Sequence, residues 1–134
     1  MRIIALRGAD NSGKTSTLKI AHQLLIKAGG LSTCKLPIPK SPSDFSDIVD
    51  YKKQKVAFFT MGDYADETKK AIHNYNTLKV DVLILASNIK FVTPIRLIVT
   101  FPNNLVIKTV AVPSNPANDL TANTTDANTI FALI

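Results

Sequence analysis

The stretch that most constrains this chain is Gly8-Ala9-Asp10-Asn11-Ser12-Gly13-Lys14-Thr15, close to the N-terminus. It fits the spacing G-x-x-x-x-G-K-[ST]. The first and second glycines of this pattern allow backbone conformations that a Cβ would hinder, so successive N–H groups can turn inward toward an anion. The spacing therefore predicts a loop that cradles phosphate groups.

The side chains of this stretch suit a nucleoside triphosphate with its metal. Lys14 supplies a positive charge for the β- and γ-phosphates, and the Thr15 hydroxyl can ligate Mg²⁺. The following helix adds free N–H groups and a dipole that favour an anion. We therefore expect every residue of the stretch, together with Ser16 in the first helical turn, to bind the nucleotide.

The flanking sequence provides the context that such a loop needs. An apolar run at residues 2–6 is typical of a buried parallel strand. After the loop, apolar residues recur at helical spacing up to Ala28, and Gly29-Gly30 then ends the helix. Strand, glycine-containing loop and helix is the order that this motif requires.

On these residues the chain resembles the P-loop (Walker A) NTPases. Its loop is similar to that of thymidylate kinases, which usually read Gly-x-Asp-Gly-x-Gly-Lys-Ser/Thr, although Asn11 replaces the usual second glycine. The resemblance covers residues 2–28 and implies phosphate-binding roles for Gly8, Gly13, Lys14 and Thr15. For Asp10 it implies contact with the transferred phosphate or its acceptor, but a thymidylate substrate does not follow.

The rest of the chain predicts further strands and helices. Strands are expected at 31–36, 44–51, 55–60, 80–86 and 105–112, helices at 64–77 and from 125 to the end, and loops at 37–43 and 113–123. Residues 44–60 fit a β-hairpin. Residues 93–101 could form a helix or a strand, and Pro94 favours a helix. The loop at 37–43 could face the ligand or only solvent.

Together these elements predict one α/β domain over residues 1–134. We expect a three-layer, P-loop NTPase-like fold, with a mostly parallel sheet of five or six strands and helices on both faces. No apolar run is long enough to span a membrane. Without room for a signal peptide before the first strand, and with Cys34 as the single cysteine, the sequence predicts a cytoplasmic protein.

The charge of the chain bears on its partners. The formal net charge is +6, from thirteen lysines and three arginines against ten acidic residues. Part of this charge suits a polyphosphate ligand. Most of the lysines are scattered and no interleaved aromatic residues accompany them, so a solvated surface is favoured over a nucleic-acid interface.

A second metal-site residue can be chosen by topology. In P-loop NTPases an acidic side chain at the end of a neighbouring strand helps to hold Mg²⁺. Asp81 lies near the beginning of its predicted strand and so at the far end of the sheet, whereas Asp63 follows its strand. Thr15 and Asp63 are therefore the predicted metal residues, although Asp63 could instead cap the helix at 64–77.

The function that the sequence favours is Mg²⁺-dependent binding of a nucleoside triphosphate, by default ATP, with phosphoryl transfer or hydrolysis. Lys14, Asp10 and Arg7 are the candidate catalytic residues, Arg7 because it ends the strand before Gly8. Arg96 is the only other candidate arginine, so a kinase lid is not evident, and a second protomer or a partner protein could supply missing groups. The alternatives are a nucleotide-dependent switch without catalysis and a nucleic-acid-binding module.

Overall fold

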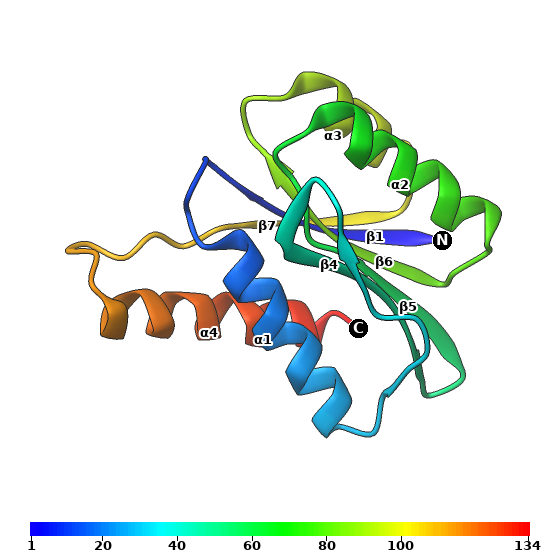
Figure 1. Cartoon of the computed structure of the whole chain (residues 1–134), viewed down its shortest axis with the longest axis horizontal. Helices are drawn as coiled ribbons and strands as arrows, with labels where there is room; N and C mark the ends of the chain where they lie inside the picture. The colour runs from blue at the N-terminus through cyan, green and yellow to red at the C-terminus, as the bar shows by residue number, and fades with distance from the viewer.

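A mixed sheet of seven strands forms the middle of the molecule in a computed structural model that describes residues 1–134 (Figure 1). The strands run in the order β2-β4-β5-β6-β1-β7, with β3 also paired to β4. Their bounds are β1 Arg2–Gly8, β2 Leu31–Ser32, β3 Leu36–Ile38, β4 Ser41–Tyr51, β5 Gln54–Phe59, β6 Val82–Asn88 and β7 Asn103–Ile107. The helices are α1 Lys14–Lys27, α2 Ala65–Thr77, α3 Val92–Ile98 and α4 Pro116–Ala132.

One half of the sheet is parallel. β1 lies between β6 and β7 and is parallel to both, and β6 is parallel to β5. In this register Gly8 is opposite Asn88, so β1 and β6 end at the same edge of the sheet. Connections between parallel strands need long crossovers, and helices α2 and α3 lie in these crossovers.

The other half is antiparallel, and the prediction of a mostly parallel sheet of five or six strands is therefore wrong. Residues Lys52 and Lys53 both have positive φ and connect β4 directly to β5, which forces these two strands to be antiparallel. The short strands β2 and β3 then add to the outer edge of β4, also antiparallel. The predicted hairpin at 44–60 is confirmed, whereas the strand predicted at 31–36 is divided into β2 and β3.

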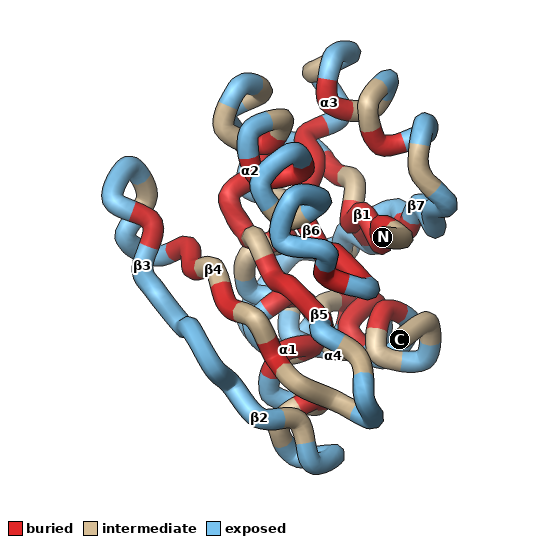
Figure 2. Tube along the Cα trace, turned by 90° about the vertical axis from the view of Figure 1, so that its right-hand side faces the viewer, coloured by how far each residue is buried: buried red, intermediate tan, exposed pale blue.

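Helices cover both faces of the sheet. On one face, α1 and α4 pack on a core of fifteen buried residues that includes Leu6, Leu18 and Ile130. On the other face, α2 and α3 pack on a core of eight that includes Ile72 and Ile98. Figure 2 shows the central strands as mostly buried and the segment with β2 and β3 as mostly exposed. The three-layer arrangement with helices on both faces is thus present, but around a mixed sheet.

The last helix differs from the prediction. Residues 113–123 were expected to form a loop, but α4 already begins at Pro116, with Asn115 as its N-cap. The Asn115 side chain accepts a hydrogen bond from the backbone N–H of Asn118 at 2.8 Å. The helix predicted over 64–77 and the helix favoured within 93–101 are confirmed as α2 and α3. No helix combines the length and the apolar character needed to cross a bilayer.

A buried ion pair attaches α4 to the end of β7. Lys108 Nζ lies 3.0 Å from Asp126 Oδ2, and both side chains are almost completely buried. Asp126 also accepts hydrogen bonds from the backbone N–H and the hydroxyl of Thr109. The pair lies beneath the start of the loop that joins β1 to α1, because a Cβ on Gly8 would come within 2.8 Å of Lys108 Cβ. It therefore connects the helix layer to the loop.

We expect Asp126→Ala to destabilise the protein by about 3–5 kcal/mol, because it leaves the buried Lys108 ammonium without an opposite charge, with only the Thr109 carbonyl oxygen as an acceptor. Urea unfolding followed by circular dichroism measures the loss. In the double variant Lys108→Met/Asp126→Leu no charge stays buried, so much of the stability should return. Equal destabilisation of the single and double variants would contradict this account.

Candidate functional site

The loop between β1 and α1 has the conformation that its glycines permit. Gly13 has φ of 92° and Asn11 has φ of 54°, both in the left-handed region. Asparagine tolerates this region better than most residues, which explains why Asn11 can occupy this position. A Cβ on Gly13 would also lie 2.7 Å from Oδ1 of Asn123 in α4. The loop is thus closely packed against α4.

Lys14 begins α1 and folds back over the loop. Its Nζ donates a hydrogen bond to the carbonyl oxygen of Ala9 at 2.6 Å, and the residue is buried. Ser12 Oγ donates to the same carbonyl at 2.8 Å. Burial lowers the pKa of Lys14, and the nearby carboxylates of Asp63 and Asp10 offset only part of this effect. An anion beside Nζ would favour the charged form of the side chain.

Asp44 faces the loop and contacts it directly. The hydroxyl of Thr15 donates a hydrogen bond to Asp44 Oδ1 at 2.7 Å. The hydroxyl of Thr60, at the end of β5, donates to the same oxygen at 2.7 Å, and Ser41 Oγ donates to Oδ2 at 2.6 Å. Because β4 is antiparallel to β5, its first residues lie at the edge where β1, β5 and β6 end. The mixed topology thus brings Asp44 to the loop.

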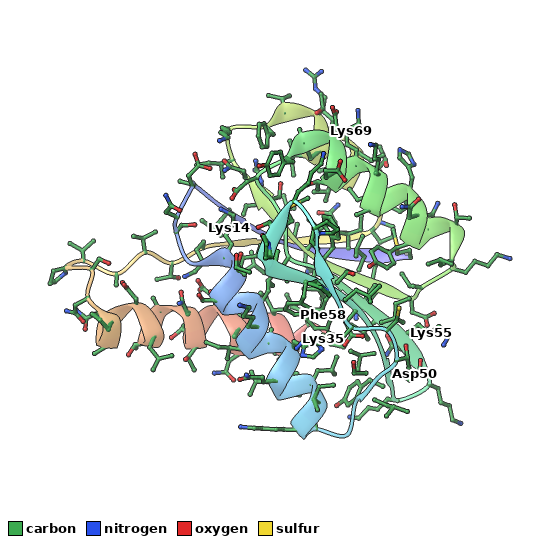
Figure 3. The ribbon with its side chains drawn as sticks, in the orientation of Figure 1. Lys14, Lys35, Asp50, Lys55, Phe58 and Lys69 are labelled. Atoms are coloured by element: carbon green, nitrogen blue, oxygen red, sulfur yellow. The ribbon has the colours of Figure 1, made fainter.

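These groups line one polar pocket of about 370 Å³. None of its lining residues is hydrophobic: they are Asn11, Ser12, Gly13, Lys14, Thr15, Ser16, Ser41, Ser43, Asp44, Thr60, Gly62 and Asp63. Most of the predicted nucleotide-binding residues and both predicted metal residues are therefore brought together. Gly8, Ala9 and Asp10 lie outside this lining. In Figure 3, Lys14 is seen at the N-terminal end of α1, at this edge of the sheet.

Asp63 lines the pocket and does not cap the following helix. The N-cap of α2 is Tyr64, with no side-chain hydrogen bond. The Asp63 carboxylate instead accepts a hydrogen bond from Asn88 Nδ2 at 3.2 Å. The alternative in which Asp63 serves only as a cap is therefore wrong, and its metal role stays a prediction.

Asp10, at the tip of the loop, is attached to the end of β6. Asn88 Nδ2 donates a hydrogen bond to its carboxylate, and Lys90 Nζ lies 3.0 Å from Oδ2. The hydrogen bond from Lys90 lowers the pKa of Asp10. A carboxylate held in this way by a lysine is ionised at neutral pH. Contact of Asp10 with a transferred phosphate or an acceptor stays a prediction.

Arg7 precedes the loop but lies on the opposite face of the sheet from α1. Every second residue of a strand points to the same face, so Arg7 shares its face of β1 with Ile3 and Ala5. Those two residues pack in the core beneath α2 and α3. Arg7 Nε is buried without a hydrogen-bond partner, as is the hydroxyl of Ser87, its register partner on β6. A catalytic role for Arg7 stays a prediction. Arg96 lies exposed on α3.

Asp81 is at the other end of the sheet, as the sequence predicts. It precedes β6, and its carboxylate accepts a hydrogen bond from the backbone N–H of Lys55 at 2.8 Å. Arg2, at the start of β1, pairs with Val82, whereas the loop follows the end of β1. Asp81 is thus separated from the loop by the length of β1.

A second polar pocket lies on the other side of the loop. It measures about 230 Å³ and shares Asn11, Ser12, Gly13 and Ser16 with the first pocket. Its remaining wall comes from the segment after β7 and the beginning of α4, including Thr109, Ser114, Asp119, Ala122 and Asn123. The loop therefore has space for polar groups on both sides.

Sequence reasoning missed Asp44 as a site residue. It placed this residue at the start of a strand and left open whether the preceding loop faces a ligand. The predicted hairpin could have placed Asp44 at the site. Its second strand ends at Thr60 beside the loop, so antiparallel pairing brings the start of its first strand, with Asp44, to the same place. Two further pocket residues, Ser41 and Ser43, belong to the segment 37–43, for which the sequence did not decide between facing a ligand and facing solvent.

Comparison of the chain with protein-family models, with curated proteins and with solved structures gives no match in any of the three. Only the residues of the chain itself therefore bear on its function.

We expect Asn11→Gly to keep the stability of the protein within about 1 kcal/mol, because glycine adopts the left-handed region freely. Asn11→Val should cost about 1–3 kcal/mol, because a β-branched residue is strained there. Thermal unfolding of both variants beside the natural chain measures the difference. A valine variant as stable as the glycine variant would show that the loop does not require positive φ at this position.

Proposed function

We propose that this chain binds a nucleoside triphosphate with Mg²⁺ in the pocket around residues 11–16 and hydrolyses or transfers its γ-phosphoryl group. The observation that carries the proposal is the hydrogen bond between Thr15 and Asp44, inside a pocket without hydrophobic residues and beside the buried Lys14. A hydroxyl, a carboxylate and a lysine at a helix N-terminus are the groups that phosphoryl chemistry uses.

The phosphates would be held by the loop and by Lys14. Lys14 Nζ donates to the Ala9 carbonyl, and a phosphate oxygen is a stronger acceptor for an ammonium group than a carbonyl is. The N–H groups in the first turn of α1 have no partner within the helix and can donate to the same anion. An anionic ligand would also offset the cost of burying the lysine charge.

The residues facing Thr15 fit a magnesium ion. The Thr15 hydroxyl gives its single proton to Asp44, so its oxygen lone pairs are available to a cation. Asp44 and Asp63 add carboxylate oxygens, and oxygen is the ligand that Mg²⁺ prefers. No group of three or more His, Cys, Asp or Glu side chains is arranged to hold a metal ion. Bound Mg²⁺ would neutralise phosphate charge and stabilise the transition state.

The second pocket supports the proposal by offering room for the nucleoside. It continues from the loop toward α4 and has hydroxyl, amide and carboxylate side chains in its wall. Its Asp119 accepts a hydrogen bond from Ser114, which fixes the carboxylate at the pocket wall. We infer that the ribose and base lie on this side of the loop, and that the γ-phosphate lies toward Asp44.

Single-turnover incubation with γ-labelled ATP tests the reaction. Release of labelled phosphate, or its transfer to an added acceptor, supports phosphoryl chemistry. Tight, Mg²⁺-dependent binding of ATP without loss of label would instead identify a nucleotide-dependent switch. The absence of ATP binding, with GTP and dTTP included in the same assay, would contradict the proposal as a whole.

We expect Lys14→Ala to weaken ATP binding by about 1.5–3 kcal/mol, or roughly 10- to 150-fold in affinity, because a charge-assisted contact to phosphate is lost. Titration calorimetry measures the affinity. Lys79→Ala, which removes an exposed lysine next to β6, is the control and should bind as the natural chain does. Natural affinity in the Lys14 variant would overturn the assignment of the loop.

We expect Asp44→Asn to abolish most of the enhancement of ATP binding by Mg²⁺, because the carboxylate charge at Thr15 is removed. Asp63→Asn should reduce the enhancement as well if it also holds the metal. Asp50→Asn is the matched control, because Asp50 lies on the same strand at the far end of the hairpin (Figure 3). Calorimetry with and without Mg²⁺ measures the enhancement, and an unchanged effect in the Asp44 variant would remove it from the metal site.

A further inference from the structure

A cavity of about 420 Å³ lies between α1 and the segment that contains β3 and the start of β4. Helix α1 contributes Lys19, His22 and Gln23 to its wall, and the facing wall includes Lys35 and Phe45. The cavity shares Ser43 and Asp44 with the polar pocket around the loop. It is therefore a separate space that adjoins the proposed phosphate site.

His22 is held rigidly at this cavity. The residue is 6% exposed, and its Nε2 lies 2.7 Å from Asp47 Oδ2. Its ring meets those of Phe45 and Phe58 edge-on, with centroids 5.0 and 5.1 Å away. Asp47 is fixed in turn by the hydroxyl of Ser32 at 2.6 Å and by two backbone N–H groups. The imidazole thus has one orientation.

The protonation of this pair leaves one ring nitrogen available. Burial raises the pKa of Asp47, but the hydrogen bonds from Ser32, His22 and the Cys34 N–H outweigh burial and lower it overall. An ionised Asp47 only accepts hydrogen bonds, so Nε2 of His22 must carry the proton. In the neutral ring, Nδ1 is then an acceptor, and it has no hydrogen-bond partner within the chain. Nδ1 is not one of the buried side-chain atoms without a partner, which are Arg7 Nε and Ser87 Oγ, so it is open to solvent and can accept a hydrogen bond from a ligand.

The charge around the cavity favours an anion. Lys19 is exposed on α1 and makes no ion pair, so its ammonium is free to meet a ligand. Lys35 lies over the Phe45 ring, 5.0 Å from its centroid, at the facing wall. The only acidic wall residue is Asp44, so the wall carries two positive charges, from Lys19 and Lys35, against one negative charge.

The position of His22 along α1 limits its role. It follows Lys14 by eight residues, and a helix rises about 1.5 Å per residue, so the two lie about 12 Å apart along the axis. At that distance His22 does not touch a phosphoryl group bound by Lys14. It can contact a ligand that lies in the cavity itself.

We propose that this cavity binds a small anionic molecule that carries a hydroxyl or N–H group. Lys19 contacts the anionic group, and Nδ1 of His22 accepts a hydrogen bond from the hydroxyl or N–H. The inference goes beyond the proposed nucleotide binding and stands without it, because none of the contacts in the cavity requires a nucleotide in the loop.

NMR of the imidazole nitrogens tests the proposal directly, because the chain has two histidines. His73 lies exposed on α2 and is an internal control. The probe is ribose 5-phosphate, added to ¹⁵N-histidine-labelled protein in the Lys14→Ala background, so that the loop does not take up the phosphate. We expect a saturable shift of His22 Nδ1 with no shift of His73, and weaker binding of uncharged ribose.

The anion contact is tested by two matched variants on α1. We expect Lys19→Gln to weaken the binding of ribose 5-phosphate by about two- to fivefold, since an exposed charged contact is lost. Lys27→Gln, an exposed lysine on the same helix outside the cavity, should leave it unchanged. The proposal is overturned if His22 does not respond to the probe, if His73 shifts equally, or if the two lysine variants bind alike. These outcomes are independent of ATP binding by the natural chain.

Discussion

The carboxylate of Asp44 joins three elements that are distant in sequence. It accepts hydrogen bonds from Thr15 in α1, from Thr60 at the end of β5, and from Ser41 near its own position on β4. A buried carboxylate requires such partners, because removing an unpaired charge from water is costly. The contacts therefore fix the position of the hairpin relative to the loop, and with it the shape of both the polar pocket and the adjoining cavity.

Much of the local structure could be predicted from the sequence because its signals are local. Helical spacing in α1 and α2, the apolar runs of β1 and β6, and the hairpin around Lys52 and Lys53 each depend on neighbouring residues. The topology of the whole sheet does not. Strands β2 and β3 are two and three residues long, and their antiparallel pairing with β4 depends on contacts that no local pattern encodes.

The errors have physical reasons that can be located in single segments. Residues 113–123 contain proline, asparagine and serine, which favour a loop, and they lack an apolar period. Yet Asn115 followed by Pro116 is an N-cap and first-turn pair, and tertiary packing of Ala122 and Ala127 then supports the helix. In the candidate site, the loop and Asp63 could be predicted from motif and strand polarity. To predict Asp44 as a site residue, one further step was needed. In an antiparallel hairpin the first strand begins at the edge of the sheet where the second strand ends, and this places Asp44 beside the loop.

The ion pair beneath Gly8 limits which part of the loop can move. Lys108 and Asp126 are buried on the side facing the sheet and α4, so the base of the loop rests on a charged pair that would be costly to separate. The tip, in contrast, is held by the exposed pair of Asp10 and Lys90, which water screens, and by one hydrogen bond from Asn88 to Asp10. An anion bound at this loop would therefore move the tip more readily than the base, and the base would hold the N-terminus of α1 in place.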